Sequence, residues 1–210
     1  MIWDRVLSSG MGPTAADMLQ AFRRDEPRLF IGAASVTVGV VVVGFLLIRR
    51  RFDRLLSFFA WFAVLYGARE WLHASILRLM APPSLLWARL DMALGFFVAV
   101  PAFLFFQETG LVGRAGRVIA YAVCLLEICL IAAIFIGVPL PLLDNLNSGL
   151  MIAGSVSLVI LGFRRSNVGR DVVVLRAGVV IFVCFVLWTN TQNLLGYHPE
   201  VEPYGFALFL

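Results

Sequence analysis

Charged and amide side chains interrupt several long apolar stretches of this 210-residue chain, and they are its candidates for chemistry. The predicted ligand-binding residues are Arg69, Glu70, His73, Arg89, Asp91, Asn190 and Gln192, with Thr189 and Asn193 beside them. Ionisable groups at membrane depth are rare because their dehydration is costly, so they normally face a partner or a water-filled cavity. The set therefore predicts a site for a small polar or anionic ligand at the outer face. The alternative is a set of interhelical pairs, such as Arg69 with Asp91 and Arg89 with Glu70, that only fix how helices pack.

Glu127 is an isolated carboxyl inside a different apolar stretch, which begins near Val118. Nine helical residues place it about 14 Å deep, near the middle of a bilayer. Dehydration at that depth favours a neutral carboxyl that donates a hydrogen bond. A proton-coupled transporter would use such a group, but a single carboxyl without a broken helix or an internal repeat is a weak indication of transport. The alternative is a hydrogen bond to a neighbouring helix.

The remaining candidates indicate no catalysis. His198, Glu200 and Glu202 alternate in a stretch with two prolines, which we interpret as a solvated loop rather than a metal site. The three cysteines all lie in apolar segments without metal-ligand spacing. The sequence contains no nucleophile elbow, HExxH motif or phosphate-binding glycine loop. For this stretch we expect no metal, no cofactor and no enzymatic activity.

The composition predicts a membrane setting for these residues. The chain is 61% hydrophobic and only 14% charged, whereas soluble domains carry about 25% charged residues. Twenty uncharged residues, 29–48, are followed at once by Arg49, Arg50, Arg51 and Arg54, and as a helix they would be about 30 Å long, the thickness of the bilayer core. The net charge is +4, and the basic residues form short arginine runs beside such stretches. This distribution indicates topology signals rather than nucleic-acid binding.

The predicted fold class is all-α, a polytopic membrane helix bundle with six complete transmembrane helices and the start of a seventh. The predicted spans are 29–48, 55–73, 85–106, 118–138, 148–163 and 172–195, and the seventh begins near Tyr204 and is truncated at Leu210. Residues 139–147 are predicted to be an outer loop because Pro139 and Pro141 open them. Residues 1–28 form an extracytoplasmic segment, either a short interfacial helix or a frayed terminus. Residues 29–210 form the membrane domain.

The distribution of arginine predicts the orientation. With the N-terminus outside, the cytoplasmic side holds ten arginines and the outer side seven, and the predicted outer loops 139–147 and 196–203 hold none. Cytoplasmic loops carry an excess of basic residues. The N-terminus is therefore expected outside and the C-terminus, after a seventh span, in the cytoplasm.

Three stretches go beyond generic membrane character: FFAWFAVLYGAREWL at 58–72, VPAFLFFQETGLVGRAGRVIAYAV at 100–123 and VEPYGFALFL at 201–210. They resemble the second span, the third and fourth spans, and the last helix of the seven-transmembrane sensor region of bacterial signalling proteins. The closest likeness is to the membrane part of SpoIIE-type (PP2C-like) phosphatases, and histidine kinases and nucleotide cyclases carry similar regions. The resemblance implies the bacterial cytoplasmic membrane, a C-terminal cytoplasmic phosphatase or kinase domain, and a homodimer formed through that part. Only 28 residues precede the first predicted span, so the ligand is expected to be small, lipidic or bound among the helices.

Three functional hypotheses follow. The first is a membrane-embedded sensor and anchor module that relays an outer or lipid stimulus to a cytoplasmic effector. The second is a small transporter or channel that uses Glu127. The third is a passive membrane anchor in which the polar residues only stabilise the bundle.

Overall fold

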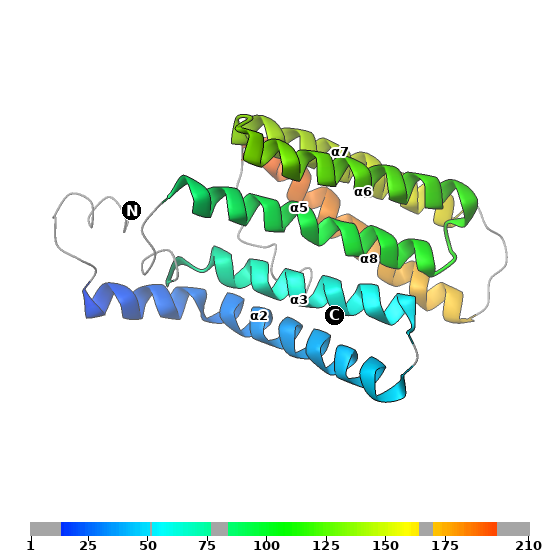
Figure 1. Ribbon diagram of the computed structural model, residues 1–210, viewed down its shortest axis with the longest axis horizontal. Coiled ribbons are helices and arrows are strands. Elements are labelled where there is room, and N and C mark those ends of the chain that lie inside the picture. Colours follow the sequence, from blue (N-terminus) through cyan, green and yellow to red (C-terminus); the bar gives the residue numbers. More distant parts are fainter. Residues whose placement is uncertain (1–13, 51, 77–83, 164–169, 197–210) are drawn as a thin grey trace.

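Six α-helices form a single bundle in the computed structural model, which describes residues 14–50, 52–76, 84–163 and 170–196 and contains no strand among them (Figure 1). The helices are α2 (Ala15–Arg49), α3 (Arg54–His73), α5 (Leu85–Glu108), α6 (Gly113–Ile136), α7 (Leu140–Phe163) and α8 (Arg170–Leu194). Successive helices run in opposite directions along the long axis of the molecule. We call the end that holds the connection between α2 and α3 the α2–α3 end, and the opposite end the α6–α7 end.

Five helices are long and apolar enough to cross a membrane: α2, α5, α6, α7 and α8. Helix α3 is 20 residues long but carries Arg69, Glu70 and His73 in its last two turns, and it does not belong to this group. The structure therefore supports a multi-pass membrane protein made of helices. The predicted count of six complete spans and a seventh is not confirmed, because α3 is not among the five candidate spans and the predicted seventh, from Tyr204, lies outside the described residues.

Side chains and glycines at the helix ends define where the helices begin and stop. Asp53 accepts hydrogen bonds from the backbone N–H groups of Leu55 and Leu56 and so caps the start of α3. Ser84 Oγ accepts from Trp87 N–H at 3.2 Å and caps α5 in the same way. Gly137 closes α6 in the left-handed conformation, at φ 100°, which glycine adopts without a steric penalty. This allows α7 to begin three residues later.

The prediction for the fifth span was wrong at its start. We placed it at 148–163 after an outer loop at 139–147, whereas α7 begins at Leu140 and is 24 residues long. Pro141 lies in the first turn of the helix, where a backbone N–H would have no helical acceptor, so the proline costs no hydrogen bond there. Consequently Asp144 and Asn147 are helical residues inside the bundle rather than loop residues.

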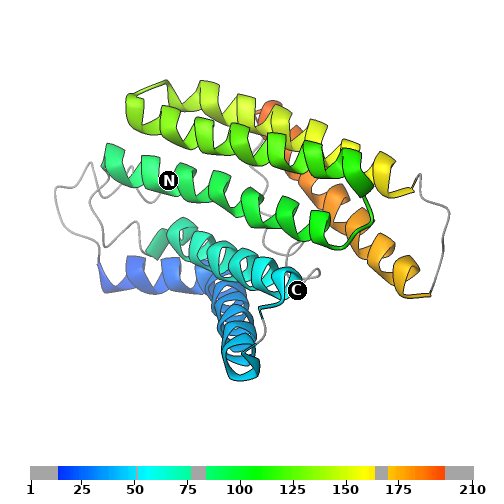
Figure 2. The same cartoon turned by 45° about the vertical axis from the view of Figure 1, so that its right-hand side comes forward.

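Helix α2 lies at the edge of the bundle beside α3 and changes direction after its first turns (Figure 2). Pro27 lies inside this helix, and a proline removes one backbone hydrogen bond and bends a helix. The apolar side chains Met18, Leu19 and Phe22, from the segment predicted as a short interfacial helix or a frayed terminus, belong to these first turns, which continue into the apolar part without a break.

Small residues let α2 and α3 approach closely. A Cβ placed on Gly67 of α3 would lie 2.5 Å from the backbone oxygen of Gly32 on α2, and one on Gly39 would lie 2.9 Å from the oxygen of Ala60. Such contacts between small residues are a common means of helix association in membranes, where close van der Waals packing replaces hydrophobic burial.

The core lies among α3, α5, α6, α7 and α8 and is rich in phenylalanine. The rings of Phe62, Phe106 and Phe182 join α3, α5 and α8, with ring centroids 5.1 Å apart for Phe106 and Phe182. Many apolar side chains point outward instead, such as Phe30 with 72% of its surface exposed. A belt of this kind is expected where lipid rather than water surrounds a protein.

Candidate functional site

A close contact between His73 and Asp91 joins α3 to α5 near the α6–α7 end. His73 Nε2 lies 2.8 Å from Asp91 Oδ1, which makes an ion pair when the imidazole is protonated, and the two side chains are 24% and 18% exposed. His73 is the last residue of α3 and Asp91 lies in the second turn of α5, so the antiparallel arrangement of these helices brings them together. The pair is therefore partly accessible from the end of the bundle.

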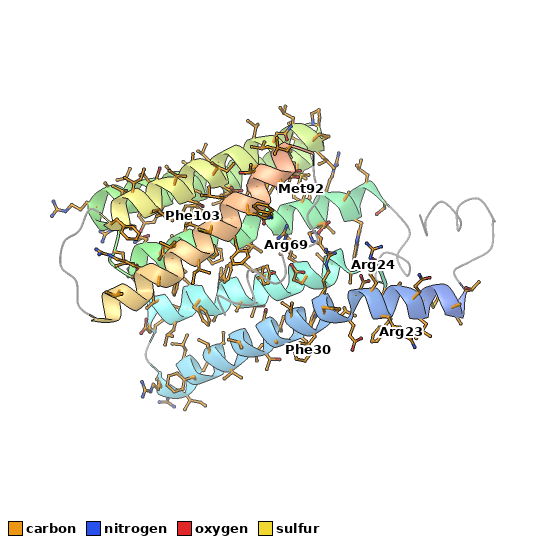
Figure 3. All side chains as sticks on the ribbon, turned by 180° about the vertical axis from the view of Figure 1, so that it is seen from behind. Arg23, Arg24, Phe30, Arg69, Met92 and Phe103 are labelled. Carbon is orange, nitrogen blue, oxygen red and sulfur yellow. The ribbon has the colours of Figure 1, made fainter. Side chains whose placement is uncertain are left out.

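Arg69 lies one helical turn deeper than His73, inside the bundle (Figure 3). Its side chain runs along Gly95 of α5, where an added Cβ would be 3.3 Å from Arg69 Nε. Gly95 follows Asp91 by one turn, so Arg69 and His73 face Gly95 and Asp91 across two helices. A glycine at this position leaves the room that the long arginine side chain needs. His73 and Asp91 thus form one contact between α3 and α5, a pair that the sequence analysis did not single out.

The other predicted residues of these two helices lie nearby. Glu70 is almost completely buried, at 1% exposure, and Arg89 is half-buried near the start of α5. The structure therefore brings the charged part of the predicted set to one end of α3 and α5.

Asp25 ties the first turns of α2 to the end of α3. Its carboxylate accepts a hydrogen bond from the backbone N–H of Ile76 at 2.9 Å and from the hydroxyl of Ser75 at 3.1 Å, and it is only 2% exposed. The indole N–H of Trp71 donates to the backbone oxygen of Leu29 at 3.3 Å and supports the same contact. Sequence reasoning missed Asp25 because it lies in a run of mixed charges, which usually forms a solvated surface.

A second set of polar contacts joins α7 to α8. The amide nitrogen of Asn193 donates to Asp144 Oδ2 and to Ser148 Oγ, both at 2.9 Å. Asn190, a predicted ligand-binding residue, instead donates to the backbone oxygen of Val186 on its own helix at 2.8 Å. Gln192 is half-buried one residue before Asn193. Sequence reasoning missed Asp144 and Ser148 because it placed them in a loop or at the start of a span.

A fully buried carboxyl makes a further polar contact, between Glu127 on α6 and Asn147 on α7. In the amide orientation that satisfies hydrogen bonding, Asn147 Nδ2 donates to Glu127 Oε1 at 2.8 Å and to Oε2 at 3.2 Å. Glu127 has no exposed surface, and it lies nine residues, or about 14 Å of helix, before the last residue of α6. Asp144 shares a helical face with Asn147 and Ser148, which follow it by three and four residues on α7. That spacing is the signal that would have identified all three.

These contacts share one end of the bundle. We use "polar layer" for the residues that make them near the α6–α7 end: Asp25, Arg69, His73, Asp91, Asp144, Ser148 and Asn193. Glu127 and Asn147 form a further pair beside it, with Glu127 on α6. Among the described residues no group of three His, Cys, Asp or Glu side chains could hold a metal ion, and His198, Glu200 and Glu202 lie outside them. The chemistry that the polar layer offers is ionic and hydrogen-bonded recognition, centred on the accessible His73–Asp91 pair.

Comparison with known proteins identifies no similar protein, so inferences about function depend on the geometry described above. No protein-family model matches the chain, and neither does a curated protein or a solved structure. Together, the sequence and the structure show a membrane-embedded protein built from apolar helices, with polar contacts concentrated toward one end.

Proposed function

We propose that this chain is the membrane-embedded sensor module of a bacterial signal-transduction protein, and that the polar layer receives the stimulus. The observation that carries the proposal is the His73–Asp91 ion pair, which links two helices and is partly exposed. A small polar or anionic ligand that competes for either partner, or for the neighbouring Arg69, would weaken the link between α3 and α5. The ligand then changes helix packing because it binds one arrangement of the helices better than the other.

The contacts of α3 with α2 support the idea that a change at the His73–Asp91 pair is transmitted to α2. One end of α3 holds His73 and the connection to Asp25 of α2, while its middle packs closely against α2 through Gly67. A shift of α3 relative to α5 would therefore move α2 with it. Coupling of this kind needs an element that has two discrete arrangements, and the α2–α3 pair is our candidate for that element.

The effector in this proposal is a C-terminal cytoplasmic domain, a SpoIIE-type phosphatase first and a histidine kinase or cyclase next. The support for it is the resemblance of residues 58–72, 100–123 and 201–210 to the sensor regions of such proteins. The proposed setting is the bacterial cytoplasmic membrane, with the N-terminus and the polar layer outside and the arginine-rich α2–α3 end in the cytoplasm. The proposed assembly is a homodimer formed through the effector.

Transport through Glu127 is the weaker alternative. The Glu127 carboxyl is completely buried and is held by Asn147 of the neighbouring helix, which matches a group that fixes two helices together. A transporter would require solute flux in proteoliposomes that Glu127→Gln abolishes. Flux of this kind would replace the sensor proposal.

The test compares effector output with stability in the full-length protein reconstituted into liposomes. Asp91→Asn keeps the shape of the side chain and removes the carboxylate that His73 contacts, whereas Val123→Ala trims a buried core side chain outside the polar layer. We expect Asp91→Asn to change basal or stimulated effector activity more than Val123→Ala does at an equal loss of stability. If output follows stability alone in both variants, the chain is a passive anchor and the sensor proposal fails.

A further inference from the structure

A narrow apolar hollow lies at the α2–α3 end of the bundle, opposite the polar layer. It is narrow and open on one side, so the roughly 300 Å³ between its walls includes space outside its mouth. Its walls come from α5, α7 and α8, with Phe106, Leu158 and Val179 among them, and the segment between α5 and α6 closes one side. The half-exposed ring of Phe163, the last residue of α7, forms its rim.

Gly162 shows that the described residues leave space here. The residue is buried, yet a Cβ placed on it would meet no atom of the described residues within 4 Å. Two turns earlier on the same helix, a Cβ on Gly154 would lie 2.8 Å from the ring of Phe103, which is the crowding expected of a well-packed interior. The hollow beside Gly162 is therefore a gap of the kind that a slender apolar group can enter.

Arg176 gives the hollow a positive charge at its edge. Among the described residues it is the only charged side chain that lines the hollow, and its guanidinium carbon lies 5.5 Å from the centre of the Phe163 ring. The same end of the bundle carries further arginines from α2, α3 and α6, of which Arg114 and Arg117 are exposed in the first turns of α6. Described acidic side chains at this end are few, namely Asp53 and Glu108.

We propose that this hollow binds one anionic phospholipid, with an acyl chain against Gly162 and the phosphate at Arg176. The depth fits because α5 and α7 both end at the hollow, at Glu108 and Phe163, so the headgroup would sit at the membrane surface and the chain would point inward. The charge fits because basic pockets between transmembrane helices attract anionic headgroups. The narrow apolar interior matches a single acyl chain better than a bulky ring. This site is distant from the polar layer and does not depend on a signalling role.

The experiment is native mass spectrometry of the full chain in detergent micelles, with phosphatidylglycerol or phosphatidylcholine of matched acyl chains. We expect the wild-type chain to retain phosphatidylglycerol in preference to phosphatidylcholine. Arg176→Gln should reduce that preference by about fivefold, which is the contribution of one arginine near an anionic surface. Arg54→Gln is the control, because Arg54 is an exposed arginine at the same end that does not line the hollow.

Filling the hollow provides a second, independent test. Gly162→Leu should abolish retention of the lipid, and the smaller Gly162→Ala should reduce it only partly. Gly149→Leu is the matched control, because Gly149 lies on the same helix, is exposed and also has no atom within 4 Å of an added Cβ. Circular dichroism of each variant checks that the helices are intact. Equal retention of both lipids by the wild-type chain, or unchanged retention by folded Gly162→Leu, would overturn the proposal.

Discussion

Replacing Gly67 with alanine tests the packing of α2 against α3 directly. The added Cβ would lie 2.5 Å from the backbone oxygen of Gly32, 2.7 Å from Val36 Cγ2 and 3.0 Å from Val36 N. Two of these three atoms belong to the α2 backbone, which cannot rotate out of the way as a side chain can. The first contact falls short of ordinary van der Waals separation, which begins at 3.4 Å, by about 0.9 Å. Helix α2 must therefore move away from α3 by a distance of that order.

The expected cost is about 1–3 kcal/mol of the free energy of unfolding, the range for inserting one extra carbon into a well-packed contact. Alanine also favours helix over glycine by about 1 kcal/mol, so the net loss should lie toward the lower half of that range. Since α2 packs mainly on α3, the separation should also free α2 from the rest of the bundle.

The assay is unfolding of the protein by SDS in mixed micelles, followed by circular dichroism. Gly149→Ala is the control, because a Cβ there meets nothing within 4 Å and the change in helix propensity is the same. Hydrogen exchange of the α2 amides then shows whether this helix in particular has loosened. If Gly67→Ala is as stable as Gly149→Ala, the close contact between α2 and α3 does not exist as described.

Two further predictions concern the buried carboxylates. Asn147→Leu should lower the free energy of unfolding by about 1–2 kcal/mol in the SDS titration, because it leaves the buried Glu127 carboxyl without its donor. Asn145→Leu is the control and should change this free energy little, because Asn145 is at an exposed position of the same helix. An equal effect of both changes would contradict the Glu127–Asn147 contact. Asp25→Ala should speed hydrogen exchange at the Ile76 amide by about tenfold, because that N–H loses its acceptor and a bond to a charged group is worth about 1.5 kcal/mol. An unchanged exchange rate would show that Asp25 does not hold this segment.

The helices themselves could largely be predicted from sequence. The predicted spans 55–73 and 85–106 differ by two residues or fewer at each end from α3 (Arg54–His73) and α5 (Leu85–Glu108). Prediction succeeds there because lipid leaves every backbone polar group to be satisfied within the segment, so a long apolar run must form a helix. The prediction was wrong at the start of α7, because Pro139, Pro141 and several polar residues indicated a loop, whereas the helix begins at Leu140 and accommodates Pro141 and the polar residues after it.

The contacts between helices were decided by the tertiary structure. Sequence reasoning identified His73 and Asp91 as candidates but did not pair them with each other, and it gave Glu127 no named partner. Asp25 was missed entirely, because its acceptor role depends on a segment some 50 residues further along the chain. The sequence by itself determined that the chain forms apolar membrane helices with polar groups toward one end. How each helix is rotated, and therefore which polar side chains meet, depends on packing against neighbours such as the Gly32–Gly67 contact, and local sequence does not encode that rotation.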